Sequence, residues 1–342
     1  MINKIPKCIA CESGMEIFLD GMFDDRYGFS GHYDVYRCTN CQQCQTMPLL
    51  NEEDLPSLYG EYYPRKEIDI SALISQIGVP SEPAQIKQRY RNGTDNQGQY
   101  IAKTGMKVLD YGCGTGASLL EIIALGAEAY GIEADPNVKQ VVDALGLRIH
   151  IGTLDNAPFA DEKFDLIVLN QVLEHIPSPE NLLVKFKKML KPKGRLVLSF
   201  PNSGSVYARF FKRLWINWHI PYHLHHFNPK SSRLFLEKNG WRVISLRTIT
   251  PNLWTVLQCR AGIETTSIGE PNPMWTGQSF GNEKNNSNDK KNKLLKYLRQ
   301  FALKGSSNIP KAILTIFNRS VDKCGFGDSL LIELELQILG VY

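Results

Sequence analysis

The stretch VLDYGCGTGA, residues 108–117, decides the fold class because it joins a buried strand to a helix through a glycine-rich turn. The strand pattern KVLDYG precedes the helical pattern ASLLEIIAL, and strands and helices then alternate to about residue 250. Such alternation is typical of a parallel sheet with right-handed crossover helices. We therefore predict an α/β domain with the glycine turn at the carboxyl edge of its sheet.

The glycines of this turn fit two different ligands. Gly112, Gly114 and Ala117 match a dinucleotide phosphate loop, whereas Gly112, Gly114 and Gly116 match a loop that holds S-adenosylmethionine. Asp110 separates the two, because its carboxylate would repel a pyrophosphate. Two like charges 4 Å apart repel by about 4 kcal/mol at an effective dielectric constant of about 20. S-adenosylmethionine carries cationic ammonium and sulfonium groups and no phosphate, so Asp110 favours that cofactor.

A second carboxylate supports this interpretation. The strand pattern YGIEADP ends at Glu133, where a carboxylate can accept hydrogen bonds from both ribose hydroxyls of a nucleoside. Each such charge-assisted bond contributes roughly 1.5–3 kcal/mol. Asp110 and Glu133 together favour a cofactor site over a tight turn that binds nothing.

Several segments resemble, in order and spacing, the motifs of class I S-adenosylmethionine-dependent methyltransferases. They are VLDYGCGTG, YGIEADP, GTLDNAPFADEKFDLIVLNQVLEHIPSPENLL and MLKPKGRLVLSFPN. The resemblance covers about residues 106–250 and the closing strand SLLIELEL. It implies a Rossmann-like, seven-stranded methyltransferase sheet whose last strand is antiparallel, with S-adenosylmethionine at the carboxyl ends of the strands.

The resemblance also assigns the cofactor-binding residues. Those on the methionyl side would be Asp110, Gly112, Gly114 and Gly116. Glu133 would hold the ribose, and Asn170 would face the sulfonium. The adenine would lie beside Ala134, Asp135, Thr153 and Leu154. At the position of Thr153, many relatives carry an acid, and that acid accepts a hydrogen bond from the adenine amino group.

The amino-terminal cysteines have the spacing of a metal site. Cys8 and Cys11 form one C-x-x-C pair, and Cys38 and Cys41 form another. Four thiolates suit tetrahedral zinc, and a closed four-cysteine site is structural rather than catalytic. A set in which Cys44 replaces Cys38 or Cys41 is the alternative. Residues 1–48 are too few to fold on a core of their own, so we predict a zinc ribbon.

The rest of the chain divides by composition. Residues 49–105 read as a helical connector, and residues 106–250 with 327–342 as the methyltransferase domain. Residues 251–326 form a helical insertion before the last strand, with the low-complexity core GNEKNNSNDKKNK. The segment SVYARFFKRLWINWHIPYHLHHFNP, residues 205–229, has apolar residues at helical spacing beside basic ones. We expect it to form a lid over the acceptor; membrane contact and plain packing are the alternatives.

Histidines are the candidate bases. A hydroxyl that is methylated loses a proton, and a positioned base contributes about 10²- to 10⁴-fold to such a step. We favour His223, then His226, with His175 of LEHIPSP as a further candidate. A metal site built from His223, His225 and His226 is the weaker alternative, because no carboxylate lies at a suitable spacing in the sequence.

Composition narrows the function further. The net charge is +4, from 39 Lys and Arg against 35 Asp and Glu, which does not favour a nucleic-acid partner. The sequence shows neither a secretory signal pattern nor about 18 consecutive apolar residues, so we expect a cytoplasmic protein. We predict a small-molecule methyltransferase, with O-methylation favoured. The alternatives are a C-methyltransferase on a nucleotide sugar, an RNA methyltransferase and a non-catalytic cofactor-binding scaffold.

Overall fold

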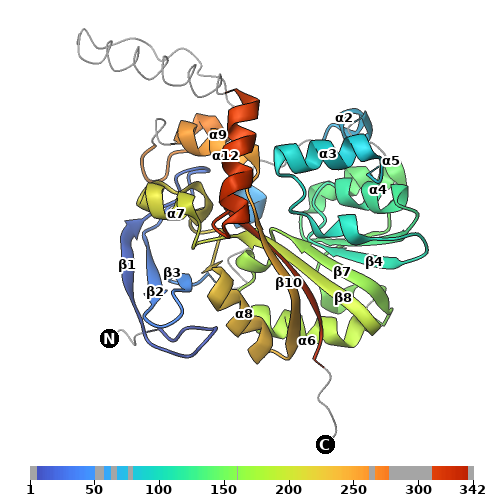
Figure 1. Cartoon of the computed structure of the whole chain (residues 1–342), viewed down its shortest axis with the longest axis horizontal. Coiled ribbons are helices and arrows are strands. Elements are labelled where there is room, and N and C mark those ends of the chain that lie inside the picture. Colours follow the sequence, from blue (N-terminus) through green and yellow to red (C-terminus); the bar gives the residue numbers. More distant parts are fainter. Residues whose placement is uncertain are drawn as a thin grey trace, which may run out of the picture.

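Two sheets organise the protein (Figure 1). The computed structural model describes residues 6–50, 58–62, 68–75, 80–159, 161–261, 266–276 and 310–337. Within these ranges, a seven-stranded sheet carries the glycine turn and a four-stranded sheet contains the cysteine ribbon. None of the helices in the described ranges combines the length and the apolar character that crossing a membrane requires.

The large sheet has the predicted architecture. Its strands are β4 (Lys107–Tyr111), β5 (Glu128–Glu133), β6 (Ile149–Ile151), β7 (Phe164–Asn170), β8 (Leu190–Pro201), β10 (Trp241–Ile249) and β11 (Ser329–Leu336). They lie in the order β10-β11-β8-β7-β4-β5-β6. Strands β4 to β8 pair in parallel, whereas β11 is antiparallel to both β8 and β10. The prediction of a seven-stranded sheet with an antiparallel last strand is therefore confirmed.

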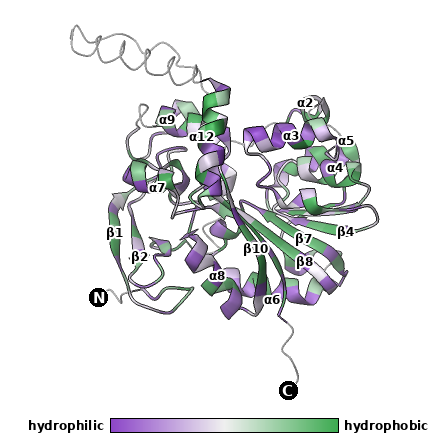
Figure 2. Cartoon of the chain, in the orientation of Figure 1, coloured by the Kyte–Doolittle hydropathy of each residue, from purple (hydrophilic) through white to green (hydrophobic). Residues whose placement is uncertain are grey.

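Helices cover both faces of this sheet, as the nearly continuous apolar strands require. The helices are α4 (Ala117–Ala124), α5 (Lys139–Leu145), α6 (Pro179–Met189) and α8 (Pro229–Lys238). Successive strand residues alternate between two cores: Val108 and Val168 pack with α4 and α5, whereas Leu109, Ile167 and Leu169 pack with α6 and α8. Green apolar residues accordingly run along β7 and β8 in Figure 2. The two cores hold the strand ends, and thus the glycine turn, in fixed positions.

The described parts of residues 49–105 contain four short helical segments. They are the π-helix η1 (Leu58–Tyr62), α2 (Ile70–Ser75), α3 (Pro83–Asn92) and the 3-10 helix η2 (Gly98–Ile101). Helix α3 begins at a proline and ends before Gly93, which has a left-handed backbone with φ of +70°. Gly93 allows the chain to turn back, and η2 then leads into the first strand of the sheet.

The cysteine ribbon is not confined to the predicted residues 1–48. Its strands are β1 (Met15–Met22), β2 (Tyr33–Cys38), β3 (Cys44–Met47) and the short β9 (His225–His226). β9 pairs with β3 through Cys44 and Gln45, so the predicted lid segment supplies the fourth strand. No sequence pattern indicates this pairing, because a two-residue strand is too short to show alternation.

The remaining elements lie beside α6 and in the insertion. Helix α6 ends at Met189 and β8 begins at Leu190, because Pro192 disfavours helix at the residue before it. The insertion contains α9 (Asn252–Ala261), α10 (Pro273–Thr276) and α12 (Lys311–Lys323). Its low-complexity core, residues 281–293, lies outside the described residues.

Candidate cofactor site and histidine cluster

The glycine turn follows β4 and leads into α4, and its backbone requires glycine. Gly112, Gly114 and Gly116 all have positive φ, at 78°, 54° and 79°. A Cβ on Gly112 would lie 2.5 Å from a methyl carbon of Val172. The segment after β7 therefore packs directly against the turn.

Asp110 is the last buried residue of β4 and lies beneath the turn. Its side chain is buried, and one carboxylate oxygen accepts a hydrogen bond from the hydroxyl of Ser118 on α4. Its other oxygen, Oδ1, is buried without a hydrogen-bond partner among the described residues. Burial raises the pKa of Asp110 to about 7, and the nearby charges of Glu133 and Glu121 act in the same direction. A cation beside Oδ1 would offset the free-energy cost of keeping the buried carboxylate ionised.

Glu133 ends β5, the neighbouring strand, and reaches the same turn. One of its oxygens accepts from the backbone N–H of Gly114 at 2.7 Å, and the other accepts from the N–H of Asp135 at 3.1 Å. Asp135 in turn caps the short helix η3 (Pro136–Val138) by accepting from the N–H of Asn137 at 2.9 Å. Ala134 lies between the two acids. The structure thus brings Asp110 and Glu133 to one site, 23 residues apart in the numbering of the sequence.

The remaining predicted residues lie at the carboxyl ends of the next strands. Leu154, after β6, is buried, and the hydroxyl of Thr153 donates to Asn156 at 3.3 Å. Asn170 ends β7, where its side-chain oxygen accepts from the N–H of Gly98 at 2.8 Å. Sequence reasoning missed this contact with η2. The amide of Asn170 also donates to Gln99 at 3.0 Å, so η2 forms a wall beside the site.

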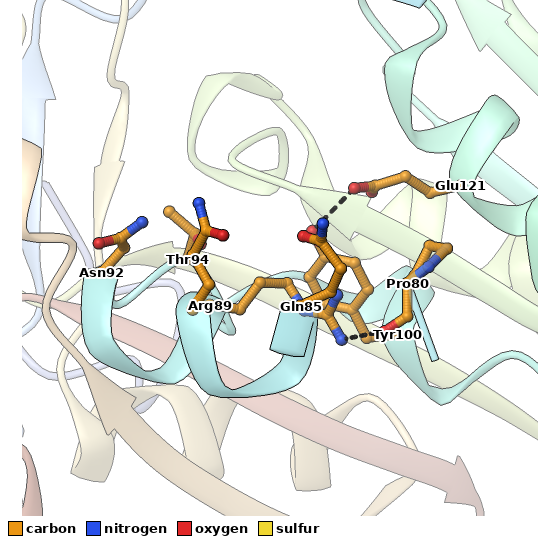
Figure 3. Close-up of a pocket in the computed structure, with 8 residues that line it drawn as sticks. Pro80, Gln85, Arg89, Asn92, Thr94, Tyr100 and Glu121 are labelled. Carbon is orange, nitrogen blue, oxygen red and sulfur yellow. Dashed lines mark hydrogen bonds between the residues drawn. The ribbon is translucent and has the colours of Figure 1, made fainter. Parts of the chain in front are cut away.

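A polar pocket continues outward from this wall (Figure 3). It has a volume of about 160 Å³ and lies between α3, η2 and α4. The guanidinium of Arg89 lies 4.0 Å from the ring centre of Tyr100, whose hydroxyl donates to Glu121 at 3.1 Å. Ligand pockets usually measure about 300–1,000 Å³, so this one is too small to hold a nucleoside cofactor. It is a polar neighbour of the glycine turn rather than the cofactor site.

The site therefore presents a buried carboxylate under a glycine turn and a second carboxylate on the adjacent strand, at the carboxyl edge of the parallel strands β4 to β8. Residues 84–246 match the family described as a methyltransferase domain. The chain contains a class I S-adenosylmethionine-dependent methyltransferase domain.

The sequence similarity to named relatives extends over only part of each relative. A ubiquinone biosynthesis O-methyltransferase of Pasteurella multocida is 36% identical over 124 residues, which is 30% of this chain and 51% of the relative. A demethylmenaquinone methyltransferase of Tropheryma whipplei is 31% identical over 124 residues, or 34% of this chain and 51% of the relative. The chain thus spans about half the length of the curated relatives that it matches.

Solved methyltransferase structures are similar only in broad outline. Coclaurine N-methyltransferase bound to N-methylheliamine and S-adenosylhomocysteine is 16% identical, with a TM-score of 0.45 and 84% of each chain covered. A methyltransferase of Archaeoglobus fulgidus described as SAM-dependent is also 16% identical, with a TM-score of 0.42, covering 78% of this chain and 99% of that one.

The four predicted cysteine ligands converge. The sulfur atoms of Cys8, Cys11, Cys38 and Cys41 all lie within 4.8 Å of one another. Three of the sulfur pairs, Cys8–Cys41, Cys11–Cys38 and Cys11–Cys41, are 3.5 Å apart. Four sulfurs bound 2.3 Å from a tetrahedral zinc would be about 3.8 Å apart, so the residues fit that ion. Cys44 is buried outside the group, with its sulfur 3.7 Å from the carbonyl of Gln42.

The segment 205–229 is packed into the interior more than a lid would require. Trp215, Trp218 and Tyr222 are buried against the ribbon, although Phe210 and Leu214 are exposed. Asp328, at the start of β11, holds the segment through three hydrogen bonds. Its carboxylate accepts from Ser205 at 2.7 Å, Trp215 at 2.9 Å and Asn217 at 3.0 Å.

The histidines of this segment take different partners. His226 contacts the Thr46 hydroxyl at 3.0 Å within the ribbon, and His225 contacts the carbonyl of Pro177 at 3.3 Å. His223 instead contacts the carbonyl of Asn217 through Nδ1 at 2.8 Å. Burial lowers the pKa of all three imidazoles. They are therefore neutral at pH 7, and they differ mainly in the groups that surround each ring.

His223 meets His175 near the glycine turn. Their ring centres are 4.6 Å apart, and His175 lies in the 3-10 helix η5 (Leu173–His175), which follows β7. The Nδ1 atom of His175 lies 2.9 Å from the hydroxyl of Tyr59 and 2.9 Å from the carbonyl of Tyr222. Two of the three candidate bases thus converge, whereas His226 faces the ribbon.

Glu174 is the residue of this cluster that sequence reasoning missed. Its side chain is buried, and neither carboxylate oxygen has a hydrogen-bond partner among the described residues. The nearest cationic candidate is Nε2 of His223, at 3.9 Å. Burial raises the pKa of Glu174 to about 8. The available signal was an acid between two apolar stretches in VLEHIP, but nothing in the sequence placed His223 beside it.

Proposed function

We propose that this protein transfers a methyl group from S-adenosylmethionine to a hydroxyl group of a small molecule. The observation that carries the proposal is the pairing of Asp110 with Glu133 around the glycine turn. Asp110 has a buried oxygen without a hydrogen bond, which suits the cofactor's ammonium group. Glu133 lies where the ribose hydroxyls can donate to it.

The charges of the site argue against a dinucleotide. Glu133 accepts from the backbone of the glycine turn, and Asp110 accepts from Ser118 at the start of α4. Glu121 follows Ser118 by three residues on α4, so the two lie on the same face of that helix. A pyrophosphate would bring two negative charges toward these three acids. The cationic ammonium and sulfonium groups of S-adenosylmethionine would instead be attracted by these acids.

Calorimetry with S-adenosylhomocysteine tests the cofactor assignment. Replacing Glu133 with Ala should weaken binding by roughly 2–4 kcal/mol, because two charge-assisted hydrogen bonds are lost. Glu128→Ala is the matched control, since Glu128 lies at the other end of the same strand and pairs with Arg148 on the surface. Equal affinity in Glu133→Ala and Glu128→Ala, or tight binding of NAD by the wild type, would refute the assignment.

We assign the acceptor side to the cluster of His175 and His223. Val172, two residues before Glu174, contacts the glycine turn, so the cluster lies beside the place where the methyl group would point. One of the two named relatives is a ubiquinone biosynthesis O-methyltransferase, which supports an oxygen acceptor; the name of the other, a demethylmenaquinone methyltransferase, does not specify the methylated atom. His223 is the favoured base and His175 the next candidate, because His226 is bonded to Thr46.

Methyl transfer from radiolabelled S-adenosylmethionine to pools of small hydroxyl compounds tests the acceptor assignment. His223→Ala should lower turnover by about 10²-fold or more while cofactor affinity stays within a few-fold. His225→Ala is the matched control, because His225 is equally buried and lies outside the cluster. Wild-type turnover in both His223→Ala and His175→Ala would contradict a histidine role.

We also propose that Cys8, Cys11, Cys38 and Cys41 hold one structural zinc ion. The sulfur spacing supports a tetrahedral ion, and four thiolates would leave it no open position for chemistry. When bound, the ion would fix the two cysteine turns relative to α8. The side-chain amide of Asn228, the residue before α8, donates to the carbonyl of Cys41 at 2.9 Å.

A further inference from the structure

A second group of metal-ligating side chains lies outside the cysteine ribbon. Glu174, His175 and His223 each offer one ligand atom, and these three atoms lie within 4.8 Å of one another. Two of the residues are neighbours in η5, and the third comes from the segment that follows the fifth parallel strand. We propose that these three residues bind a divalent transition-metal ion.

Glu174 supplies the strongest argument. Its side chain is 1% exposed, and neither oxygen accepts a hydrogen bond from any described residue. An ionised carboxylate in such a place is costly unless it is paired with a positive charge or coordinates a metal; with neither, it takes up a proton, and its oxygens still lack hydrogen-bond partners. The backbone carbonyl of Glu174 accepts from the N–H of Leu224 at 2.8 Å, which holds η5 against the segment that carries His223. This bond keeps the segment against η5, where the carboxylate of Glu174 lies 3.9 Å from Nε2 of His223.

The histidines are oriented as metal ligands usually are. Carbonyl oxygens only accept hydrogen bonds, so Nδ1 of His223 donates to Asn217 and Nδ1 of His175 donates to Tyr222. The ring of His223 then keeps a lone pair on Nε2. A hydrogen bond from one ring nitrogen to a carbonyl is the usual device that fixes the tautomer of a metal-bound histidine. For His223 that lone pair belongs to the nitrogen 3.9 Å from Glu174.

The donor set selects the class of ion. Two imidazole nitrogens and one carboxylate oxygen suit zinc, iron, cobalt or nickel in the divalent state, whereas magnesium and calcium prefer oxygen ligands throughout. Three protein ligands would leave at least one coordination position for an oxygen donor, as in catalytic rather than structural sites. The cluster thus differs in kind from the four-thiolate group.

The place of the cluster indicates what such an ion would do. Val172 of the same loop contacts Gly112, so the ion would lie on the acceptor side of the glycine turn. This part of the inference rests on the proposed function: a hydroxyl group bound to the ion would lose its proton to solvent water more easily, and its oxygen would take the methyl group from S-adenosylmethionine, which leaves as S-adenosylhomocysteine. His223 and His175 would then act as ligands, and their variants would lose turnover because the ion is lost.

Metal titration of the full chain tests the site without any turnover. We expect the wild type, purified without metal and loaded with Co²⁺, to bind two equivalents at pH 7.5. One should show strong sulfur-to-metal charge-transfer absorption, and the other only weak d–d bands. Glu174→Gln should lose the weak bands and keep the charge-transfer band, and Cys38→Ser should do the reverse. Mg²⁺ in excess should not displace the second equivalent.

Two variants keep the result interpretable. Glu174→Gln preserves shape, so it should fold even if His223→Asn does not, and circular dichroism checks this. His225→Asn removes a buried histidine outside the cluster and should retain both equivalents. A wild type that binds one equivalent, or a second equivalent that Glu174→Gln leaves unchanged, would overturn the proposal. Binding of S-adenosylhomocysteine, measured separately, reports on the proposed function, so the two can fail independently.

Discussion

The glycine turn and the histidine cluster occupy one edge of the large sheet, yet they are assembled in opposite ways. The turn is made by consecutive residues after β4, and Glu133 reaches it from the adjacent parallel strand. The cluster joins His175 of η5 to His223, 48 residues later, and Tyr222 and Leu224, the neighbours of His223, pack with residues of the ribbon. Parallel pairing alone positions the first site, whereas packing between distant segments positions the second.

Because of this difference, we expect the two sites to respond differently to mutations in the ribbon. Backbone N–H groups and two carboxylates define the turn, so it should tolerate changes in the ribbon. The cluster should not, because β9 pairs with β3 and His226 contacts Thr46. Three experiments test this contrast between the two sites, and they follow in decreasing order of expected effect.

The largest effect should come from the cysteine ribbon. Cys38→Ser should lose the thiolate-bound metal, because such zinc sites contribute about 10–16 kcal/mol of binding free energy in zinc-finger peptides. The ribbon strands and β9 should loosen, which the fluorescence of buried Trp218 would report, while affinity for S-adenosylhomocysteine stays within a few-fold.

Cys44→Ser is the control for this change, since Cys44 is buried in the same sheet but lies outside the ligand group. Elemental analysis should find its metal content unchanged. If Cys44→Ser loses the metal and Cys41→Ser keeps it, the ligand set is wrong.

A smaller effect should follow from one methyl group at the glycine turn. Gly112 and Gly105 lie at the two ends of β4 with nearly equal φ, +78° and +82°. An alanine at Gly105 has no atom within 4 Å and should cost about 1 kcal/mol from backbone strain alone. An alanine at Gly112 collides with Val172 and should cost about 1–3 kcal/mol more.

Thermal unfolding measures both variants, and calorimetry measures their cofactor affinity. We expect only Gly112→Ala to lose affinity for S-adenosylhomocysteine. Equal stability of the two variants would mean that Val172 does not press on the turn.

The smallest effect concerns pH. Burial raises the pKa of Asp110 to about 7, so the free protein carries a proton there below pH 7. The cofactor's ammonium favours the ionised carboxylate, and binding must then release that proton. Affinity should therefore rise with pH up to about 7 and fall roughly tenfold for each pH unit below it. The cofactor's own amino group stays protonated in this range.

Calorimetry between pH 5.5 and 7 checks this slope. Asp110→Asn should bind more weakly at pH 7 and show no such slope. A wild-type affinity independent of pH would place the ammonium away from Asp110.

The large sheet could be predicted from the sequence because its signals are local. Apolar runs such as FDLIVLN, the glycine turn and the closing alternation SLLIELEL each specify one element, and parallel pairing then brings their carboxyl ends together. The pairing of Asp110 with Glu133 follows from that topology alone.

The ribbon and the cluster could be predicted only in part. The spacing of the cysteines identified the four sulfurs, but β9 is two residues long and left no pattern. Glu174 looked like an ordinary loop acid because its burial depends on the return of residues 219–224 over η5. Such burial is a property of tertiary packing, which a single sequence does not display.

Crystallography of the protein with S-adenosylhomocysteine tests the central claim most directly. The account predicts that both ribose hydroxyls donate to Glu133, which gives up its bond to the N–H of Gly114. The amino group should lie within hydrogen-bond distance of Asp110, and the sulfur should face the side of Asn170 and η5. Electron density for the nucleoside at another edge of the sheet, or a ribose that does not contact Glu133, would contradict the account.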